Sequence, residues 1–308
     1  MAVTLKRLSS IAPFVFKIFP LSTPSRFSTL YNFSVSSINQ TTLHIRPVNP
    51  ENGAEVDDAQ EFLKWQNGGG HFHKSSCIDP TVLIEIGAIV HSKSVLGANV
   101  HVGSGTVIGP CVTIGQFTKI GYNAALSNCT VGDSCVIHSG VCIGQDGFGF
   151  CVDEDGNLVK KPQMLNVRIG NHVDIGANTC IDRGRPIYNE SMSPIWLHSW
   201  RETVIGDHSK IDNLVQIGHN VVIGKSCMLC GQVGIAGSVM IGDYAVLGGR
   251  VAVRDHVSIA SKVRLAANSC VTKDIREPGD YGGFPAVPIH VWRRQIAIQC
   301  RRSNREKS

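Results

Sequence analysis

The residues with the clearest potential for chemistry are histidines in a repetitive segment. His219 stands in the stretch Gln216–Val221, within a repeat of six residues. Gly237 follows three such repeats later, and His256 follows another three repeats and one position after Gly237. If three repeats make one turn of a coil, an imidazole base, a backbone N–H without a side chain and a second imidazole stack along one edge. Acyl transfer to an amine requires a general base, an oxyanion donor and polar support. For a single histidine, a purely structural role is the commoner outcome.

Asp212 and Asn213 lie one repeat before His219. They are expected either to orient its imidazole or to reach a site across a subunit boundary.

The element that must position these residues is a six-residue repeat. From Val90 an aliphatic residue returns every six positions, as at Leu96, Val102 and Ile108, and the longest uninterrupted run extends from Ile205 to Val271. A period of six fits neither a helix face nor a simple strand, but it fits three short strands per triangular turn. The sequence therefore predicts an all-β fold, a left-handed parallel β-helix over residues 81–275, with about eight coils of three repeats each. Gly and Asn are expected at its corners, where positive φ is needed.

Composition limits the other function classes. The net charge of +5 is modest and forms no basic stripe, so nucleic-acid binding is not indicated. No apolar run reaches the roughly 18–20 residues that span a membrane. The eleven cysteines show no disulfide framework, and Cys227 and Cys230, although spaced as CxxC, fall inside the repeats and are interpreted as buried apolar residues. His71 and His73 lack further ligands nearby, so neither a metal nor another cofactor is predicted.

The N-terminal region has the composition of a targeting sequence. Residues 1–50 contain no Asp or Glu, are rich in Ser, and carry early basic residues such as Lys6 and Arg7. These features are typical of an organellar transit peptide, with a mitochondrion favoured and a chloroplast as the alternative. Residues 51–80 are interpreted as a short connector.

Two interruptions and a tail complete the chain. The first interruption contains Asp146-Gly147-Phe148-Gly149-Phe150, whose aromatic pair could line a ligand pocket or a subunit contact, or simply pack within its own loop. The second, residues 185–199, contains two prolines and is interpreted as an exposed insertion. Residues 276–308 form a tail with a helix that begins near Ile289. Arg293 and Arg294 make this helix basic, as a solvated face or as a surface for an acidic carrier protein.

Four stretches together resemble the UDP-3-O-acylglucosamine N-acyltransferase family of lipid A synthesis. They are residues 146–150, 175–184, 211–224 and 277–279, and the likeness covers roughly residues 80–300. The resemblance implies a homotrimer of left-handed β-helices with active sites between subunits. It also implies transfer of a 3-hydroxyacyl group from acyl carrier protein to the 2-amine of a UDP-glucosamine already acylated at O3.

The resemblance also implies roles for individual residues. His219 matches the family's general base, Gly237 the residue whose backbone N–H faces the oxyanion, and His256 a supporting histidine. The basic helix resembles the segment that docks the carrier protein. The remaining candidates would lie near the sugar and acyl ligands: Asp146, Phe148, Gly149, Phe150, Gln163, Asp212, Asn213 and Gln216.

This chain differs from the family in two respects, and three other functions are compatible with parts of its sequence. The bacterial family has a sizeable N-terminal domain that grips the uridine, for which this chain has little room, and residues 185–199 stand where the family has a short connection. We expect this insertion to distort a coil next to the active site and to lower activity. The alternatives are a γ-class carbonic anhydrase, whose HxxxxH pair is missing here, a coenzyme-A-dependent acetyltransferase, and a non-catalytic β-helix.

Overall fold

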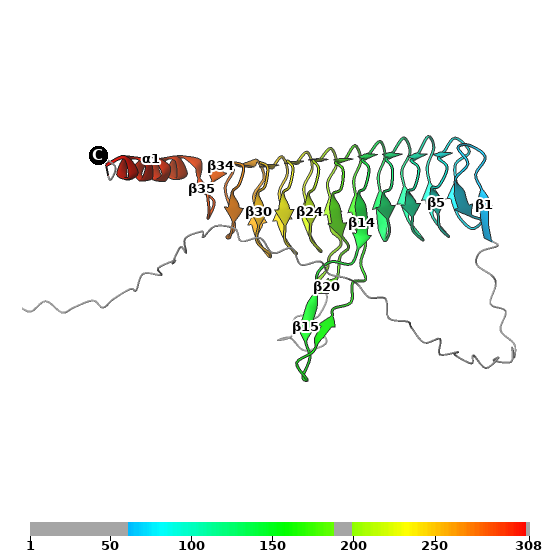
Figure 1. The fold of residues 1–308 in the computed structure, drawn as a ribbon, viewed down its shortest axis with the longest axis horizontal. Coiled ribbons are helices and arrows are strands. Elements are labelled where there is room, and N and C mark those ends of the chain that lie inside the picture. The colour runs from blue at the N-terminus through cyan, green and yellow to red at the C-terminus, as the bar shows by residue number, and fades with distance from the viewer. Residues whose placement is uncertain (1–60, 188–198, 306–308) are drawn as a thin grey trace, which may run out of the picture. The chain divides into compact units, whose positions relative to one another are not determined.

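The computed structural model describes residues 61–187 and 199–305. The expected transit peptide, residues 1–50, residues 51–60 of the connector and most of the 185–199 insertion lie outside the described residues. The described chain forms a parallel β-helix with three faces, which confirms the predicted all-β fold (Figure 1).

The chain visits three sheets in turn, called here sheets 1, 2 and 3, and each sheet forms one face. The strands of sheet 1 are β1 (Phe62–Lys64), β2 (His71–His73), β5 (Ile89–Val90), β8 (Val107–Ile108), β11 (Ala125–Leu126), β14 (Cys142–Gln145), β19 (Cys180–Asp182), β24 (Gln216–Ile217), β27 (Gly234–Ile235), β30 (Ala252–Val253) and β33 (Cys270–Val271). Those of sheet 2 are β3 (Cys77–Ile78), β6 (Val95–Leu96), β9 (Thr113–Ile114), β12 (Cys129–Val131), β17 (Val167–Ile169), β22 (Thr203–Ile205), β25 (Val222–Ile223), β28 (Met240–Ile241) and β31 (Ser258–Ile259). Those of sheet 3 are β4 (Leu83–Ile84), β7 (His101–Val102), β10 (Lys119–Ile120), β13 (Val136–Ile137), β18 (Asp174–Ile175), β23 (Lys210–Ile211), β26 (Met228–Leu229), β29 (Val246–Leu247), β32 (Val263–Leu265), β34 (Gly279–Gly282) and β35 (Val287–Pro288).

The stack is longer than the expected 81–275 at both ends. Parallel pairing already links β2 to β5, and it still links β32 to β34. The count of about eight coils was too low, since the three sheets contain 11, 9 and 11 strands. The six-residue spacing already holds upstream of Val90, at Phe72, Ile78 and Ile84, so the repeat count began too late, and across the interruptions the spacing is lost.

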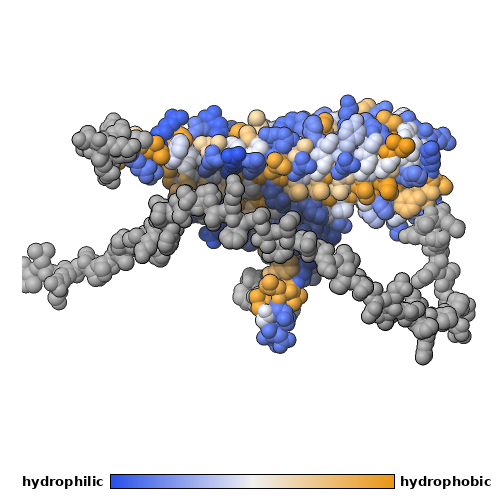
Figure 2. Space-filling view, viewed as in Figure 1, coloured by the Kyte–Doolittle hydropathy of each residue, from blue (hydrophilic) through white to orange (hydrophobic). Residues whose placement is uncertain are grey.

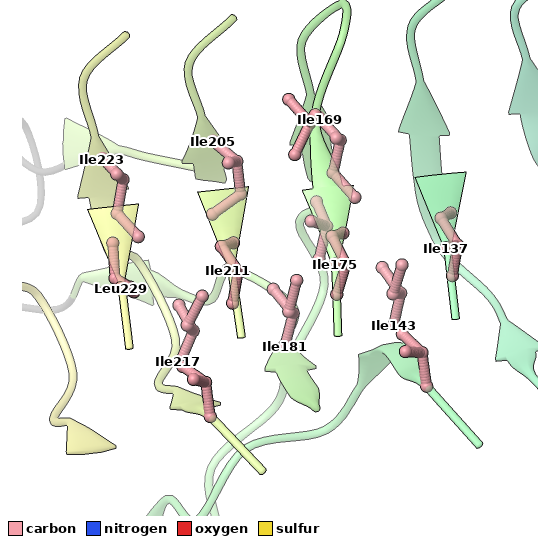
Figure 3. Packing of buried hydrophobic residues seen from close by; sticks show 14 of the residues in the cluster. Ile137, Ile143, Ile169, Ile175, Ile181, Ile205, Ile211, Ile217, Ile223 and Leu229 are labelled. Atoms are coloured by element: carbon pink, nitrogen blue, oxygen red, sulfur yellow. The ribbon is translucent and has the colours of Figure 1, made fainter. Parts of the chain in front are cut away.

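The repeated aliphatic residues form columns inside the prism. Ile169, Ile205 and Ile223 stack in sheet 2, and the corresponding residues of sheets 1 and 3 face them across the interior (Figure 3). The small residue four places after each aliphatic one is also buried, as at Val100 and Val112. Burial of this ladder supplies the core that aromatic residues would provide elsewhere.

The corners hold residues with positive φ, and asparagine is only one of their types. Phe117, Leu214 and His256 have φ near 58° just as Asn99 and Asn220 do. A left-handed residue costs roughly 1–2 kcal/mol when it is not Gly. Backbone hydrogen bonds offset that cost, because the corner N–H groups of Phe117, Leu214 and His256 each donate to a carbonyl oxygen of the coil before.

Both interruptions leave the stack between sheet 1 and sheet 2, on successive coils. The first carries the antiparallel hairpin of β15 (Phe150–Val152) and β16 (Leu158–Lys160), and the second begins and ends in the pair β20 (Pro186–Ile187) and β21 (Ser199–Trp200). In Figure 1 both project from the same side of the stack. The expected distortion by the second interruption is not seen, because β22 keeps its register with β17 and with β25.

The predicted C-terminal helix is present as α1 (Ile289–Arg305). It follows the short hairpin of β34 and β35, and its Trp292 lies directly over Gly283. A Cβ atom on Gly283 would approach Trp292 Cδ1 to an impossibly short distance, and its φ of 98° also requires glycine.

Candidate functional site

The candidate site lies at the corner between sheet 1 and sheet 2, called here the 1–2 corner. His219 lies between β24 and β25, Gly237 between β27 and β28, and His256 between β30 and β31. The Ser238 N–H donates to the His219 carbonyl at 2.9 Å, and the His256 N–H donates to the Gly237 carbonyl at 3.1 Å. The structure thus places the three residues on successive coils along one edge.

The imidazole of His219 lies directly against Gly237. A Cβ atom added to Gly237 would lie 2.5 Å from His219 Cε1 and 2.7 Å from Nε2, closer than non-bonded carbon atoms can approach. The imidazole can occupy this position only because residue 237 has no side chain. His219 is only 9% exposed there.

Asn220 sets the tautomer of His219. Its Nδ2 donates to the carbonyl oxygens of Arg185 at 2.7 Å and Arg201 at 2.5 Å, so both amide hydrogens are committed. Its Oδ1, which can only accept, lies 2.8 Å from His219 Nδ1. Nδ1 must then carry the proton, which leaves the lone pair of Nε2 free to act as a base.

The environment keeps this imidazole neutral. Burial is the main reason that the pKa of His219 is lowered, and electrostatic repulsion of the imidazolium by Arg185 and by His256 lowers it further. The hydrogen bond to Asn220 acts in the opposite direction. A neutral imidazole with a free Nε2 is the form that accepts a proton at physiological pH.

The backbone N–H of Gly237 is available to a ligand. No acceptor for it is found among the described residues, although the stacked position of the next coil holds Asp255, whose carboxylate lies 3.4 Å from Arg254 Nε. At other corners the equivalent N–H is capped, as at Gln116, which donates to Asp133. An unengaged N–H beside a neutral base is suited to hold a developing oxyanion.

The first interruption brings only part of its motif to this corner. Asp146 pairs with Lys160 at 2.6 Å, and Phe148 packs against Phe150 with ring centroids 5.0 Å apart. Phe148 is 89% exposed, and apolar residues gather on this hairpin above a hydrophilic tip (Figure 2).

Gly149 and Gln163 lie closer to the stack. A Cβ atom on Gly149 would lie 2.9 Å from Gln163 Nε2, and Gln163 is buried with no hydrogen-bond partner for either amide atom among the described residues. Such a buried, unpaired amide indicates a place for a polar ligand.

Gln216, itself exposed, belongs to a hydrogen-bonded network around the buried Asp182. Asp182 Oδ1 accepts from Gln145 at 2.9 Å and from Gln216 at 3.3 Å. Burial raises the pKa of Asp182, and the two amide donors partly counteract that rise. The network joins three successive strands of sheet 1, namely β14, β19 and β24.

Asp212 and Asn213 lie at another corner of the same chain, between sheet 3 and sheet 1. There Asn213 Oδ1 accepts from the Ala177 N–H at 2.7 Å, and both residues line a cavity with Gly231 and Arg250. The expectation that they orient His219 is wrong within one chain, because a shift of one repeat moves to the next face. Contact across a subunit boundary stays a prediction.

Arg293 and Arg294 are exposed on α1, at the C-terminal end of the stack and away from His219 in the fold. Thiol chemistry is disfavoured at the buried cysteines, since burial raises the pKa of Cys129 to about 12 and also raises the pKa of Cys227. Within the described residues no three His, Cys, Asp or Glu side chains are grouped as a metal site would need, and no helix is long and apolar enough to cross a membrane.

Sequence reasoning missed Asn220, Arg185, Arg201 and Ser238. Asn220 occupies a corner with φ of 59°, as asparagine does at many other corners, so its type carried no functional signal. The arginines belong to the second interruption, and only the fold shows that both of its ends meet at Asn220.

Comparison with known proteins agrees with this fold. Residues 202–237 match the bacterial transferase hexapeptide family (six repeats), and residues 59–159 match the GlmU-like, C-terminal hexapeptide family. Among solved structures, the UDP-N-acetylglucosamine acyltransferase of Campylobacter jejuni is similar at 21% identity with a TM-score of 0.51, over 70% of this chain and 72% of that one. A likeness at that identity supports the fold.

Two curated relatives carry the family assignment. The chain is 61% identical over 285 residues to a probable mitochondrial UDP-3-O-acylglucosamine N-acyltransferase 2 of Arabidopsis thaliana, which covers 92% of this chain and 88% of the relative. It is 46% identical over 189 residues to the UDP-3-O-acylglucosamine N-acyltransferase of Rhizobium meliloti, covering 61% of this chain and 49% of the relative. The chain therefore spans about half the length of the bacterial relatives it matches. It belongs to the UDP-3-O-acylglucosamine N-acyltransferase family, a family of hexapeptide-repeat acyltransferases.

Proposed function

We propose that this chain is an N-acyltransferase that moves a 3-hydroxyacyl group from acyl carrier protein to the 2-amine of UDP-3-O-acylglucosamine, giving a UDP-2,3-diacylglucosamine. The observation that carries this proposal is the neutral imidazole of His219, with its Nε2 free and its ring against Gly237. The names of the relatives supply the acceptor.

The reaction follows from these groups. Nε2 of His219 takes a proton from the acceptor amine as its nitrogen attacks the thioester carbonyl, and a C–N bond forms. The Gly237 N–H donates to the oxyanion of the tetrahedral intermediate. When the intermediate collapses, the C–S bond breaks and the thiolate receives the proton from His219. His256 lies one coil beyond Gly237 and supports the polar edge.

The assembly in this proposal is a homotrimer with sites between subunits. One chain presents His219 at the 1–2 corner, and Asp212 and Asn213 at the corner between sheets 3 and 1. A neighbouring subunit that faces the 1–2 corner would unite the two halves. The exposed aromatic pair of the first interruption, Phe148 and Phe150, supplies surface for such a contact. Light scattering tests this part through the mass in solution.

The carrier and the compartment complete the proposal. Arg293 and Arg294 on α1 offer positive charge to an acidic carrier protein, and the acid-free residues 1–50 would direct the chain to mitochondria. The Arabidopsis relative is itself named mitochondrial.

The decisive test is an assay of the purified mature protein with acyl carrier protein thioesters and UDP-3-O-acylglucosamine. The His219→Ala variant is expected to lose about 10²–10⁴-fold in kcat, the usual contribution of a general base. His208→Ala is a matched control, because His208 stacks on His172 at the corner between sheets 2 and 3, at a centroid distance of 4.9 Å. Undiminished transfer by His219→Ala would overturn the mechanism.

A further inference from the structure

Both ends of the second interruption deliver an arginine to the 1–2 corner. The Asn220 amide donates to the main-chain carbonyls of Arg185 and Arg201, so these two residues are fixed beside the residue that holds His219. The Arg185 N–H also lies 3.3 Å from Asn220 Oδ1. The backbones of both arginines are therefore held at Asn220, next to the candidate base.

Arg201 is a partly buried cation, and not all of its N–H groups have an acceptor among the described residues. Its Nη2 donates to the Ser238 carbonyl at 3.1 Å, while its buried Nε has no acceptor within residues 61–187 and 199–305. Burial lowers the pKa of Arg201. The Ser238 hydroxyl is also buried and has no partner in the same part of the chain. Buried donors and charges of this kind cost free energy unless a partner completes them.

Arg185 faces the first interruption. Its Nη1 would lie 3.3 Å from a Cβ atom on Gly149, the same point that lies 2.9 Å from Gln163 Nε2. Its positive charge is felt at the imidazole of His219. The unpaired amide of Gln163 and the guanidinium of Arg185 thus meet over a glycine that leaves room for a ligand.

The surrounding charges leave this place positive. Within residues 61–187 and 199–305, neither Arg185 nor Arg201 forms an ion pair with a carboxylate. The acids near this corner are engaged elsewhere: Asp146 pairs with Lys160, Asp182 accepts from Gln145, Glu202 lies 3.8 Å from Arg168 and Asp255 lies 3.4 Å from Arg254. An anion with several acceptor oxygens is the ligand whose charge and acceptors suit guanidinium N–H groups of this kind.

We infer that Arg185 and Arg201, together with Gln163, bind the phosphate oxygens of a substrate beside His219. The inference rests on the proposed function, in which both substrates carry phosphate. The acceptor has the diphosphate of its UDP group, and the carrier has the phosphodiester of its phosphopantetheine arm. A phosphate grip at the two ends of the second interruption would give this chain an additional means of holding a substrate.

Calorimetry with uridine diphosphate, inorganic pyrophosphate and 4′-phosphopantetheine as separate probes tests the inference without turnover. Arg185→Gln and Arg201→Gln are each expected to weaken one class of probe by about 10–100-fold, the worth of a charge-assisted hydrogen bond. Arg185→Lys and Arg201→Lys should recover part of the loss. Arg168→Gln removes the same charge from the outer face of β17, 3.8 Å from Glu202, and is expected to leave binding within about twofold.

The pattern of loss identifies the phosphate. Weakened uridine diphosphate and pyrophosphate binding, with a matching rise in KM for the UDP-sugar, supports the inference with the acceptor as its source. Weakened phosphopantetheine binding, with a rise in KM for the carrier, supports it with the donor as its source. Unchanged binding of all three probes, or a fall in kcat without any change in binding, overturns it.

The phosphate-binding inference and the proposed function can each be wrong while the other is right. If wild-type protein binds a phosphate probe through these arginines but transfers no acyl group, the proposed function fails and the inference stands. If wild-type protein transfers the acyl group and the folded arginine variants bind every probe normally, the inference alone fails. Arg185→Gln leaves the main-chain contacts to Asn220 in place, so a fold defect in Arg201→Gln does not decide the result.

Discussion

The uninterrupted coils and the 1–2 corner around the two interruptions use the same repeat in opposite ways. In the regular coils, side-chain hydroxyls close the corners, as when Ser94, Thr106 and Thr118 each donate to a carbonyl one turn away at 2.7–2.9 Å. At the 1–2 corner, the buried polar side chains with an atom that lacks a partner in the described part of the chain are Gln145, Gln163, Arg201 and Ser238. In the described part of the chain, the buried hydroxyls of the regular coils bond to the coils themselves. This corner, in contrast, leaves hydrogen-bond donors and acceptors for a ligand.

The largest expected effect comes from removing core volume in a regular coil. Ile114 is 1% exposed and faces the interior from β9, so Ile114→Ala is expected to lower the free energy of unfolding by about 2–5 kcal/mol through lost burial and a residual cavity. Urea unfolding followed by circular dichroism measures the loss. Leu158→Ala is the control, since Leu158 is 74% exposed on β16 and should cost under about 0.5 kcal/mol. Equal losses would show that the hairpin is as much a part of a packed core as the coils are.

A second test adds one methyl group at each of two glycines in the same turn. Gly237→Ala places a Cβ atom 2.5 Å from His219 Cε1, so the imidazole must leave its position and kcat is expected to fall about 10²–10³-fold. Steady-state kinetics on folded protein measures this loss.

Gly234→Ala is the matched control for that change. An added Cβ atom on Gly234, in β27 shortly before Gly237, meets nothing within 4 Å, so activity is expected to stay within about twofold. A Gly237→Ala enzyme with normal kcat would show that the imidazole does not work from this position.

A third test asks whether Asn220 serves the candidate site or only the turn of the backbone at its corner. Asn220→Ala removes the acceptor of His219 Nδ1 and the anchor of both arginine carbonyls, so kcat is expected to fall about 10–100-fold. Asn99→Ala is the control at another corner, because Asn99 has nearly the same φ, 57° against 59°, and pays the same backbone cost. Comparable kinetic losses in the two variants would mean that Asn220 serves only the turn.

The difference between the two regions also explains what the sequence could predict. The inward residues follow from the six-residue spacing, because burial in a prism imposes that period directly. Returning to the same edge takes three repeats, so the stacking of Gly237 on His219 was predictable as well. The single repeat from Asn213 to His219 moves to the next corner instead. The meeting of Arg185 and Arg201 at Asn220 depends on where an irregular segment leaves and rejoins the stack, and no period encodes that.

The smallest expected effect is a shift in the titration of His219. Burial and the charge of Arg185 both disfavour the imidazolium, so the pKa of His219 lies below its ordinary value of 6.5. Protonation blocks Nε2, so base catalysis is retained from neutral pH down to about 6.5 and is lost only at lower pH. Arg185→Gln removes one of the causes and is expected to move the pKa of His219 upward, while Arg168→Gln, on the outer face of β17, leaves it in place. NMR titration of the labelled imidazole measures this directly and does not depend on substrate, whose own amine also titrates. A pKa that does not change in Arg185→Gln would mean that the arginine brought in by the second interruption is not felt at His219, and the 1–2 corner would then be electrostatically no different from the regular coils.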